Sequence, residues 1–240
     1  MANQNIKQQT FWRFSVLHRS VHFIVMFAFI GIGLTGFSMA FSSMEPARVF
    51  VRLLGGVDTV RYLHRLFAVA LYLCVVLEVL WLLYYKFILG GNLLGPNSIC
   101  FTKQDISYFG AHMRYMLALR DTPPPFERFA WWEKLDYWTL FIGMQTMGLT
   151  GLILWFPEFF SRFLPGYFIN LAQVLHFDEA VLAVAYKFFV HTTVRHLRPE
   201  VYPGDWTIFT GKTTKEKMMR THPGEWARLN ASAPVNSRVE

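Results

Sequence analysis

The sequence predicts an all-α integral membrane protein: a four-helix bundle with an amphipathic cytoplasmic surface helix and a short polar C-terminal tail. Two observations predict this fold. Hydrophobic residues make up 53% of the 240 positions and charged residues only 16%, whereas about a quarter of an ordinary soluble domain is charged. Four stretches also reach the roughly 20 apolar residues that a membrane-spanning helix needs. They cover about residues 22–41, 66–88, 137–156 and 171–194.

We expect these spans to form a single membrane domain over residues 1–240. The first apolar run follows a polar N-terminal tail and is too long for the hydrophobic core of a cleavable signal, so we expect it to stay as an anchor. A loop of about residues 89–136 joins the second and third spans. Within it, Asp105 to Leu119 has apolar residues at helical spacing, which indicates the surface helix. The polar tail covers about residues 198–240, and we expect disorder beyond about Ser232.

The distribution of charge orients the spans. Most of the 23 Lys and Arg residues lie in the N-terminal tail, the 89–136 loop and the C-terminal tail, and the opposite side holds only Arg48, Arg52, Arg61, Arg65 and Arg162. The positive-inside rule then predicts that both termini are cytoplasmic in a bacterial inner membrane. Because the basic residues are spread over three segments between membrane spans, the sequence argues against a nucleic-acid partner. Membrane lipid is the expected surrounding of the spans.

Cysteine content narrows the redox chemistry. The two cysteines, Cys74 and Cys100, are too few for an iron–sulfur cluster, and neither lies in a C-x-x-C-H sequence of the kind that attaches haem covalently. Cys74 lies in the second span, where we expect it to be a small packing residue.

Four histidines mark the ends of the apolar runs: His22, His64, His176 and His191. Histidine is costly in hydrocarbon and usually stays there with a partner, and imidazole is a common axial ligand of haem iron. Because successive spans run in opposite directions, His22 and His191 fall near the cytoplasmic face, and His64 and His176 near the other face. The pattern therefore predicts two haem b groups, one held by each pair.

The spacing within the fourth span agrees with this prediction. His176 and His191 are 15 residues apart, which places them on much the same helix face and about 22 Å apart along the axis. That leaves room for one haem near each face of a bilayer core about 30 Å thick. His18, one turn before His22, is a secondary candidate that fits an interfacial or haem-propionate contact. The alternative is that these histidines are interior residues with ordinary hydrogen-bond partners.

Small residues recur in the first and third spans. They allow a macrocycle or another helix to approach the backbone closely, and either explanation fits. They are Gly31, Gly33, Gly36, Gly143, Gly148 and Gly151.

Several short motifs together resemble a known family. The chain resembles the four-helix di-haem cytochrome b subunits of respiratory formate dehydrogenases and nickel–iron hydrogenases, within the bacterial membrane b-cytochrome superfamily. The likeness covers about residues 11–228. The motifs are Ser20-Val21-His22-Phe23, Leu34-Thr35-Gly36, Leu63-His64-Arg65, the stretch from Gly148 to Pro157, and the stretch from His176 to His191. The last spacing is one residue longer than in the formate dehydrogenase branch, so the branch stays open.

The resemblance implies the same axial ligands in the same pairs, and a quinone site beside the cytoplasmic haem. Two imidazoles per iron leave no open position, so such haems carry electrons and do not bind oxygen. We therefore expect electron transfer between a periplasmic redox partner and the membrane quinone, either menaquinone or ubiquinone. The resemblance favours an iron–sulfur or multihaem cytochrome subunit as that partner. The chain would be the electron-transfer and quinone-reactive subunit of a larger oxidoreductase, not the subunit that oxidises the primary substrate.

Two ionisable residues are candidates for proton transfer to the quinone. Glu78 lies 14 residues after His64, about 21 Å farther along the helix axis, and Lys187 lies one turn before His191. An interhelical salt bridge is the alternative for both residues. Asp178 and Glu179, next to His176, would tune a haem or dock a basic partner, or simply cap a helix.

Two other functions remain open at this point. One is a haem-free membrane anchor for catalytic subunits, and the other is a histidine-based metal or proton transporter.

Overall fold

The computed structural model describes residues 9–199 and 201–231. The chain divides into two compact units. One unit consists of residues 16–83 and 139–194 and contains most of each apolar helix. The other gathers residues from the N-terminal tail, from the stretch 84–138 and from the tail after residue 194. The predicted disorder beyond Ser232 concerns residues outside the described part of the chain.

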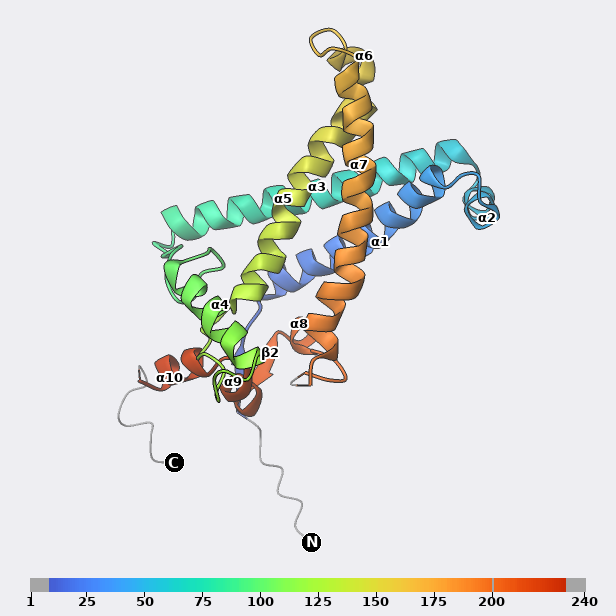
Figure 1. Cartoon of the computed structure of the whole chain (residues 1–240). Coiled ribbons are helices and arrows are strands. Elements are labelled where there is room, and N and C mark those ends of the chain that lie inside the picture. Colours follow the sequence, from blue (N-terminus) through green and yellow to red (C-terminus); the bar gives the residue numbers. More distant parts are fainter. Residues whose placement is uncertain (1–8, 200, 232–240) are drawn as a thin grey trace. The chain divides into compact units, whose positions relative to one another are not determined.

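Four helices in the described residues are long and apolar enough to cross a membrane, as predicted. Three are continuous α-helices: α1 (Val16–Ala40), α3 (Val57–Phe87) and α5 (Trp131–Trp155). The fourth, Tyr167–Leu197, begins as α7 (Tyr167–Ala185) and continues through two π-helical segments, η1 (Tyr186–His191) and η2 (Thr193–Leu197). The colours of Figure 1 let the reader follow each helix in chain order.

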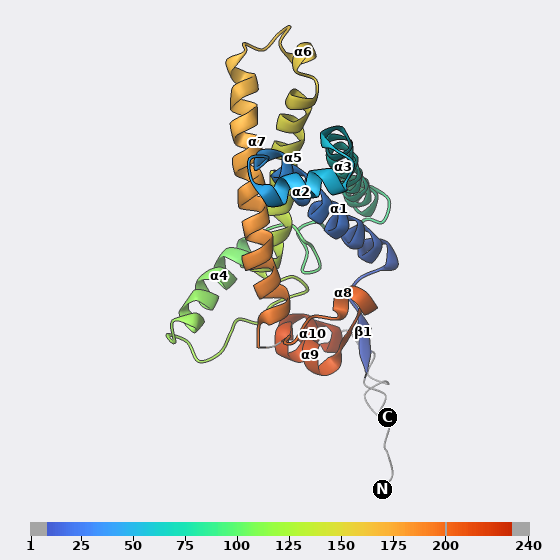
Figure 2. The same cartoon turned by 90° about the vertical axis from the view of Figure 1, so that its right-hand side faces the viewer.

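Short helices connect the long ones within each half of this unit. Helix α2 (Glu45–Leu53) lies between α1 and α3, and α6 (Pro157–Phe160) lies between α5 and α7. Both begin at or next to a proline, whose fixed φ suits the first turn of a helix. The result is two helical hairpins, α1–α3 and α5–α7, which are labelled in Figures 1 and 2.

The helices begin earlier than the hydropathy pattern indicates. Helix α3 starts at Val57 and α7 at Tyr167, before the apolar runs that we assigned from residues 66 and 171. Hydropathy marks only the part of each helix that would face lipid, whereas the helical hydrogen bonds continue through polar turns beyond that part. His64 and His176 therefore lie inside their helices. Asp178 and Glu179 follow the start of α7 by about three turns, so the helix-capping interpretation was wrong.

The long helices expose their apolar side chains. Only 6–17% of the most hydrophobic stretch of each helix is buried inside the protein. Leu73, Leu80 and Phe188, for example, are 55–68% exposed, an arrangement that suits hydrocarbon as the surrounding solvent. Cys74 is buried, which confirms its predicted packing role.

The second unit contains the predicted surface helix, α4 (Lys103–Met116). Thr102 and Asp105 form a capping box at its start, and the Asp105 carboxylate also binds the Lys134 ammonium at 2.8 Å. Both ends of this ion pair are buried. The pair joins α4 to the first turn of α5.

The polar tail contains helices and a strand that its composition did not predict. It contains α8 (Thr207–Thr210), β2 (Lys212–Thr214), α9 (Lys215–Thr221) and α10 (Pro223–Ala231). Strand β2 pairs antiparallel with β1 (Thr10–Trp12) from the N-terminal tail. Composition marked this segment as polar, but composition could not show that the segment pairs with a strand far away in the sequence.

Ion pairs of a buried glutamate join the C-terminal tail to the N-terminal tail and to the loop of residues 89–136. The Glu225 carboxylate is 2% exposed and pairs with the guanidinium groups of Arg13 and Arg128. Arg13 also donates from Nη2 to the Arg128 carbonyl oxygen at 2.6 Å. One glutamate therefore ties together the N-terminal tail, the loop before α5, and α10.

A second buried carboxylate, Glu133, lies in the first turn of α5. It accepts a hydrogen bond from the Arg195 guanidinium at 2.5 Å and from the backbone N–H of Ala130 at 3.1 Å. His222 Nε2 lies 3.4 Å from Oε2, the same Glu133 oxygen that accepts from Ala130. His222 of the tail thus takes part in a buried polar network.

Asp205 fixes the start of α8 in the same unit. Its carboxylate binds the Lys217 ammonium at 2.5 Å and accepts from the Thr207 backbone N–H at 2.8 Å. Burial raises the pKa of this carboxyl, but these hydrogen bonds outweigh burial and hold the pKa below its ordinary value.

Candidate haem site

His64 of α3 and His176 of α7 face each other in the structure. Their ring centroids lie 6.3 Å apart, and the ring planes are inclined at 64°. Two axial imidazoles, each with a metal–nitrogen bond of about 2 Å, have ring centroids roughly 6 Å apart. The separation of these two rings therefore fits a pair of ligands on opposite sides of one iron. Of the two predicted histidine pairs, His64–His176 is the one for which a ring contact is seen among the described residues.

Each ring is held by a threonine of the neighbouring helix. Thr35 Oγ1 of α1 lies 3.0 Å from His64 Nδ1, and Thr150 Oγ1 of α5 lies 2.9 Å from His176 Nδ1. Both hydroxyls are buried, and each is also within hydrogen-bond distance of the backbone carbonyl four residues earlier. The second ring nitrogen, Nε2, carries no such bond to threonine and is left for a ligand.

A glycine follows each threonine and lies under the same ring. A Cβ added at Gly36 would come within 3.1 Å of His64 Cε1, and one added at Gly151 within 3.2 Å of His176 Cε1. Both distances are tighter than ordinary contacts between side chains. These two glycines therefore allow the imidazoles to approach the backbone of the neighbouring helix closely.

Two of the other predicted small residues, Gly31 and Gly148, serve helix packing. A Cβ at Gly31 would meet the Phe67 ring at 2.5 Å, and one at Gly148 would meet the Tyr72 ring at 2.2 Å. In both cases a ring from α3 packs directly on the glycine backbone. All four of these glycines thus admit a side chain of a neighbouring helix, and close approach by a macrocycle stays a prediction.

The facing histidines border a large cavity between the four long helices. Its volume is about 1010 Å³, and its lining is mostly apolar, as is usual for sites that bind cofactors. Arg61 and Arg65 of α3 also line it, and the Arg65 guanidinium lies over the Trp155 ring at 5.0 Å. The cavity thus offers an apolar wall that suits a haem macrocycle and guanidinium groups that suit the carboxylates of haem propionates.

The remaining candidate ligands lie elsewhere in this unit. His22 is half-buried in α1, and His191 is half-buried at the end of η1. Neither lines the His64–His176 cavity, so the pairing of His22 with His191 stays a prediction. A π-helical turn holds about one residue more than an α-helical turn. The prediction that His176 and His191 share one helix face assumed α-helical spacing throughout, and this spacing ends at Tyr186. His18 is half-buried and packs edge-on against Trp81, with ring centroids 5.4 Å apart.

The ionisable candidates are separated by the structure. Lys187 lines the His64–His176 cavity, with its ammonium 5.3 Å from the Tyr186 ring centroid. Glu78 is half-buried in α3 but does not line that cavity. Glu179 does line it, and its carboxylate oxygen lies only 2.7 Å from where a Cβ of Gly143 would be. The cavity lining therefore includes the Glu179 carboxylate, for which the sequence had left open the tuning of a haem.

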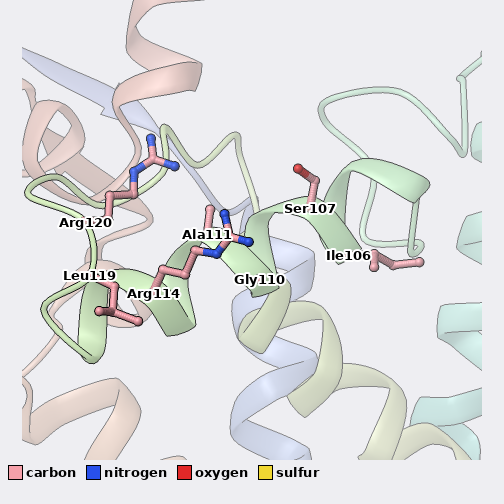
Figure 3. Close-up of a pocket in the computed structure, with 7 residues that line it drawn as sticks. All are labelled: Ile106, Ser107, Gly110, Ala111, Arg114, Leu119 and Arg120. Atoms are coloured by element: carbon pink, nitrogen blue, oxygen red, sulfur yellow. The ribbon is translucent and has the colours of Figure 1, made fainter.

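A smaller hollow of about 470 Å³ lies on α4 and the turn after it. Figure 3 shows Arg114 rising from the helix and Arg120 from the following turn. The lining contains no histidine, cysteine or carboxylate, so it offers no usual ligand for iron. Within the described ranges, no group of three or more His, Cys, Asp or Glu side chains is placed to hold a bare metal ion.

Comparison with known proteins agrees with this geometry. Residues 13–196 match the sequence model of the prokaryotic cytochrome b561 family. The chain belongs to this family. The cytochrome is thus a multi-pass membrane protein with a haem and an electron-transport role, and the resemblance stated from its motifs is confirmed at the level of the family. The match ends at residue 196, short of the predicted likeness to residue 228. A comparison with curated proteins found no match.

Sequence reasoning missed the two threonines that hold the ring nitrogens. A signal was present, because the tripeptide Leu-Thr-Gly occurs at residues 34–36 and again at 149–151. We used both copies only as motifs of the resemblance. Their shared role depends on which histidine each helix meets.

Proposed function

We propose that this cytochrome carries electrons across a bacterial inner membrane through two haem b groups. His64 and His176 would hold one haem, and His22 and His191 the other. The observation that carries the proposal is the facing of His64 and His176 at 6.3 Å, with both Nδ1 atoms occupied by threonine. Haem iron bound in this way supplies one-electron transfer and has no open position for oxygen.

The protein's own part is to bind, orient and insulate. The threonines orient the two imidazoles, the glycines give the rings room, and the apolar cavity wall excludes water. Arg61 and Arg65 supply positive charge at the start of α3, which suits haem propionates. Because tight orientation lowers the reorganisation needed at each transfer, such a site favours electron transfer.

The two ends of the pathway follow from charge and from the family. The excess of Lys and Arg in the tails and the 89–136 loop supports cytoplasmic termini. With that orientation, the His64–His176 pair faces the periplasm, where an iron–sulfur or multihaem partner would donate electrons. The membrane quinone would accept two electrons and two protons near the His22–His191 pair. This direction of electron flow is proposed by analogy with the family. Flow in the opposite direction, from quinol to a periplasmic acceptor, would use the same residues.

An optical spectrum of the purified cytochrome tests the proposal. We expect reduced b-type bands and about two haems per chain by extraction. One haem per chain would refute the second pair, and a colourless protein would refute haem binding and favour an anchor. The facing of only two histidines also argues against a transporter site for a bare metal ion, which typically has about four protein or water ligands.

Replacing Glu78 with glutamine tests the proposed proton transfer. If Glu78 delivers protons to the quinone, Glu78→Gln should slow quinone turnover by about 100-fold, the usual range for loss of a positioned acid or base. Both haem bands should stay unchanged. Asp121→Asn, at an exposed loop position, is the control and should keep full turnover. Unchanged turnover in Glu78→Gln would reject the role and leave Lys187 as the remaining candidate.

A further inference from the structure

Two equivalent half-sites make up the His64–His176 pair. In the first hairpin, Thr35 and Gly36 of α1 contact His64 of α3. In the second, Thr150 and Gly151 of α5 contact His176 of α7 in the same way. The two ring nitrogens that receive these contacts are the same, Nδ1, and the distances differ by 0.1 Å. The arrangement is therefore repeated, not incidental.

The hydroxyl geometry indicates which atom donates. Thr35 Oγ1 lies 2.7 Å from the Gly31 carbonyl oxygen, and Thr150 Oγ1 lies 2.8 Å from the Thr146 carbonyl oxygen. A carbonyl oxygen can only accept, so each hydroxyl proton goes to the helix backbone. The hydroxyl oxygen then accepts from the imidazole, which requires the proton on Nδ1. The backbone carbonyls of Ile32 and Met147 also accept from His64 and His176, which requires a proton on the ring in the same way. This tautomer leaves the Nε2 lone pair free, as a metal ligand needs.

We propose that Thr35 and Thr150 are positioning residues that fix the tautomer and orientation of His64 and His176 and lower the reduction potential of the haem between them. The proposal rests on the haem assigned to this pair under the proposed function. A hydroxyl that donates to a carbonyl becomes a better acceptor. By accepting from Nδ1–H, it makes the imidazole a stronger donor to iron, as outer-shell hydrogen bonds do at metal sites. A stronger donor stabilises ferric over ferrous iron.

Valine variants isolate the hydroxyl. Thr35→Val and Thr150→Val keep the shape of a side chain that is 2–5% exposed, and they leave the helix backbone bonds intact. Each should raise the midpoint potential of one haem, and the double variant should give roughly the sum, because the two bonds act on opposite ligands of the same iron. The serine variants keep the hydroxyl and should restore the original potential.

The control is a neighbouring hydroxyl that does not touch a histidine. Ser38 is buried one turn after Thr35, and its hydroxyl donates to the Thr35 carbonyl oxygen at 2.8 Å. Ser38→Ala should leave the potential unchanged. The potentials are read by redox titration of the haem bands in a His22→Ala background, so that a single haem titrates, with haem content measured in parallel.

The outcomes are distinct. A rise in potential for valine but not for serine supports the proposal, and so does loss of haem from valine variants alone. Equal potentials in threonine and valine variants would overturn it. Loss of haem from valine and serine variants alike would overturn it too, because keeping the hydroxyl in serine would then not preserve haem binding. Failure of the proposed function itself looks different: His64→Ala or His176→Ala would then keep all of its haem.

Discussion

His176→Ala should lose one of two haems and keep the other. Its ring is half of the facing pair, and an alanine leaves the iron with a single protein ligand, so we expect roughly half of the haem content and of the reduced-band amplitude. His64→Ala should lose the same haem. The double variant should lose no more than either single variant, because residues that act as a unit are not additive. Haem extraction and redox titration measure this directly.

The matched control is His112→Ala. His112 lies on α4 and packs against Trp132, with ring centroids 4.8 Å apart, far in sequence from either predicted pair. It should keep both haems. If the His64 and His176 variants lose different haems, so that the double variant has none, the pairing is wrong.

Glu225→Gln should loosen the tail from the rest of its unit. The substitution leaves the buried Arg13 guanidinium and its neighbour Arg128 without the carboxylate that both now bind. Breaking a buried ion pair on one side costs about 3–5 kcal/mol, which is a large share of the stability of a small folded unit. We expect α9 and α10 to become sensitive to protease in detergent-solubilised protein, while the haem bands persist.

Glu216→Gln is the control for this effect. Glu216 is an exposed carboxylate in the first turn of α9, so its loss should cost well under about 1 kcal/mol. Equal protease resistance of the two variants would show that the Glu225 ion pairs contribute little. The experiment also reports on the N-terminal tail, since Arg13 lies next to strand β1.

Hydropathy alone determined the four spans, because the length and apolarity that a bilayer requires are local properties of the sequence. The candidate histidines were also identified from sequence, since an imidazole in an apolar run is conspicuous, and helix direction predicted their levels without coordinates. The amphipathic helix α4 was visible for a similar reason, because its apolar spacing lies within one short segment, although the helix runs from Lys103 to Met116 and not from Asp105 to Leu119.

Tertiary structure decided how those residues are held. The contact of Thr35 with His64 joins residues of two helices, and the register between helices depends on packing that no single segment encodes. The partners of the buried Glu225 come from segments about 100 and 200 positions away, so composition could describe the tail only as polar. Sequence thus determined which groups are present and predicted at what depth they lie. Folding determined which atoms meet, because a hydrogen bond or an axial ligand depends on distances between chain segments that are far apart in the sequence.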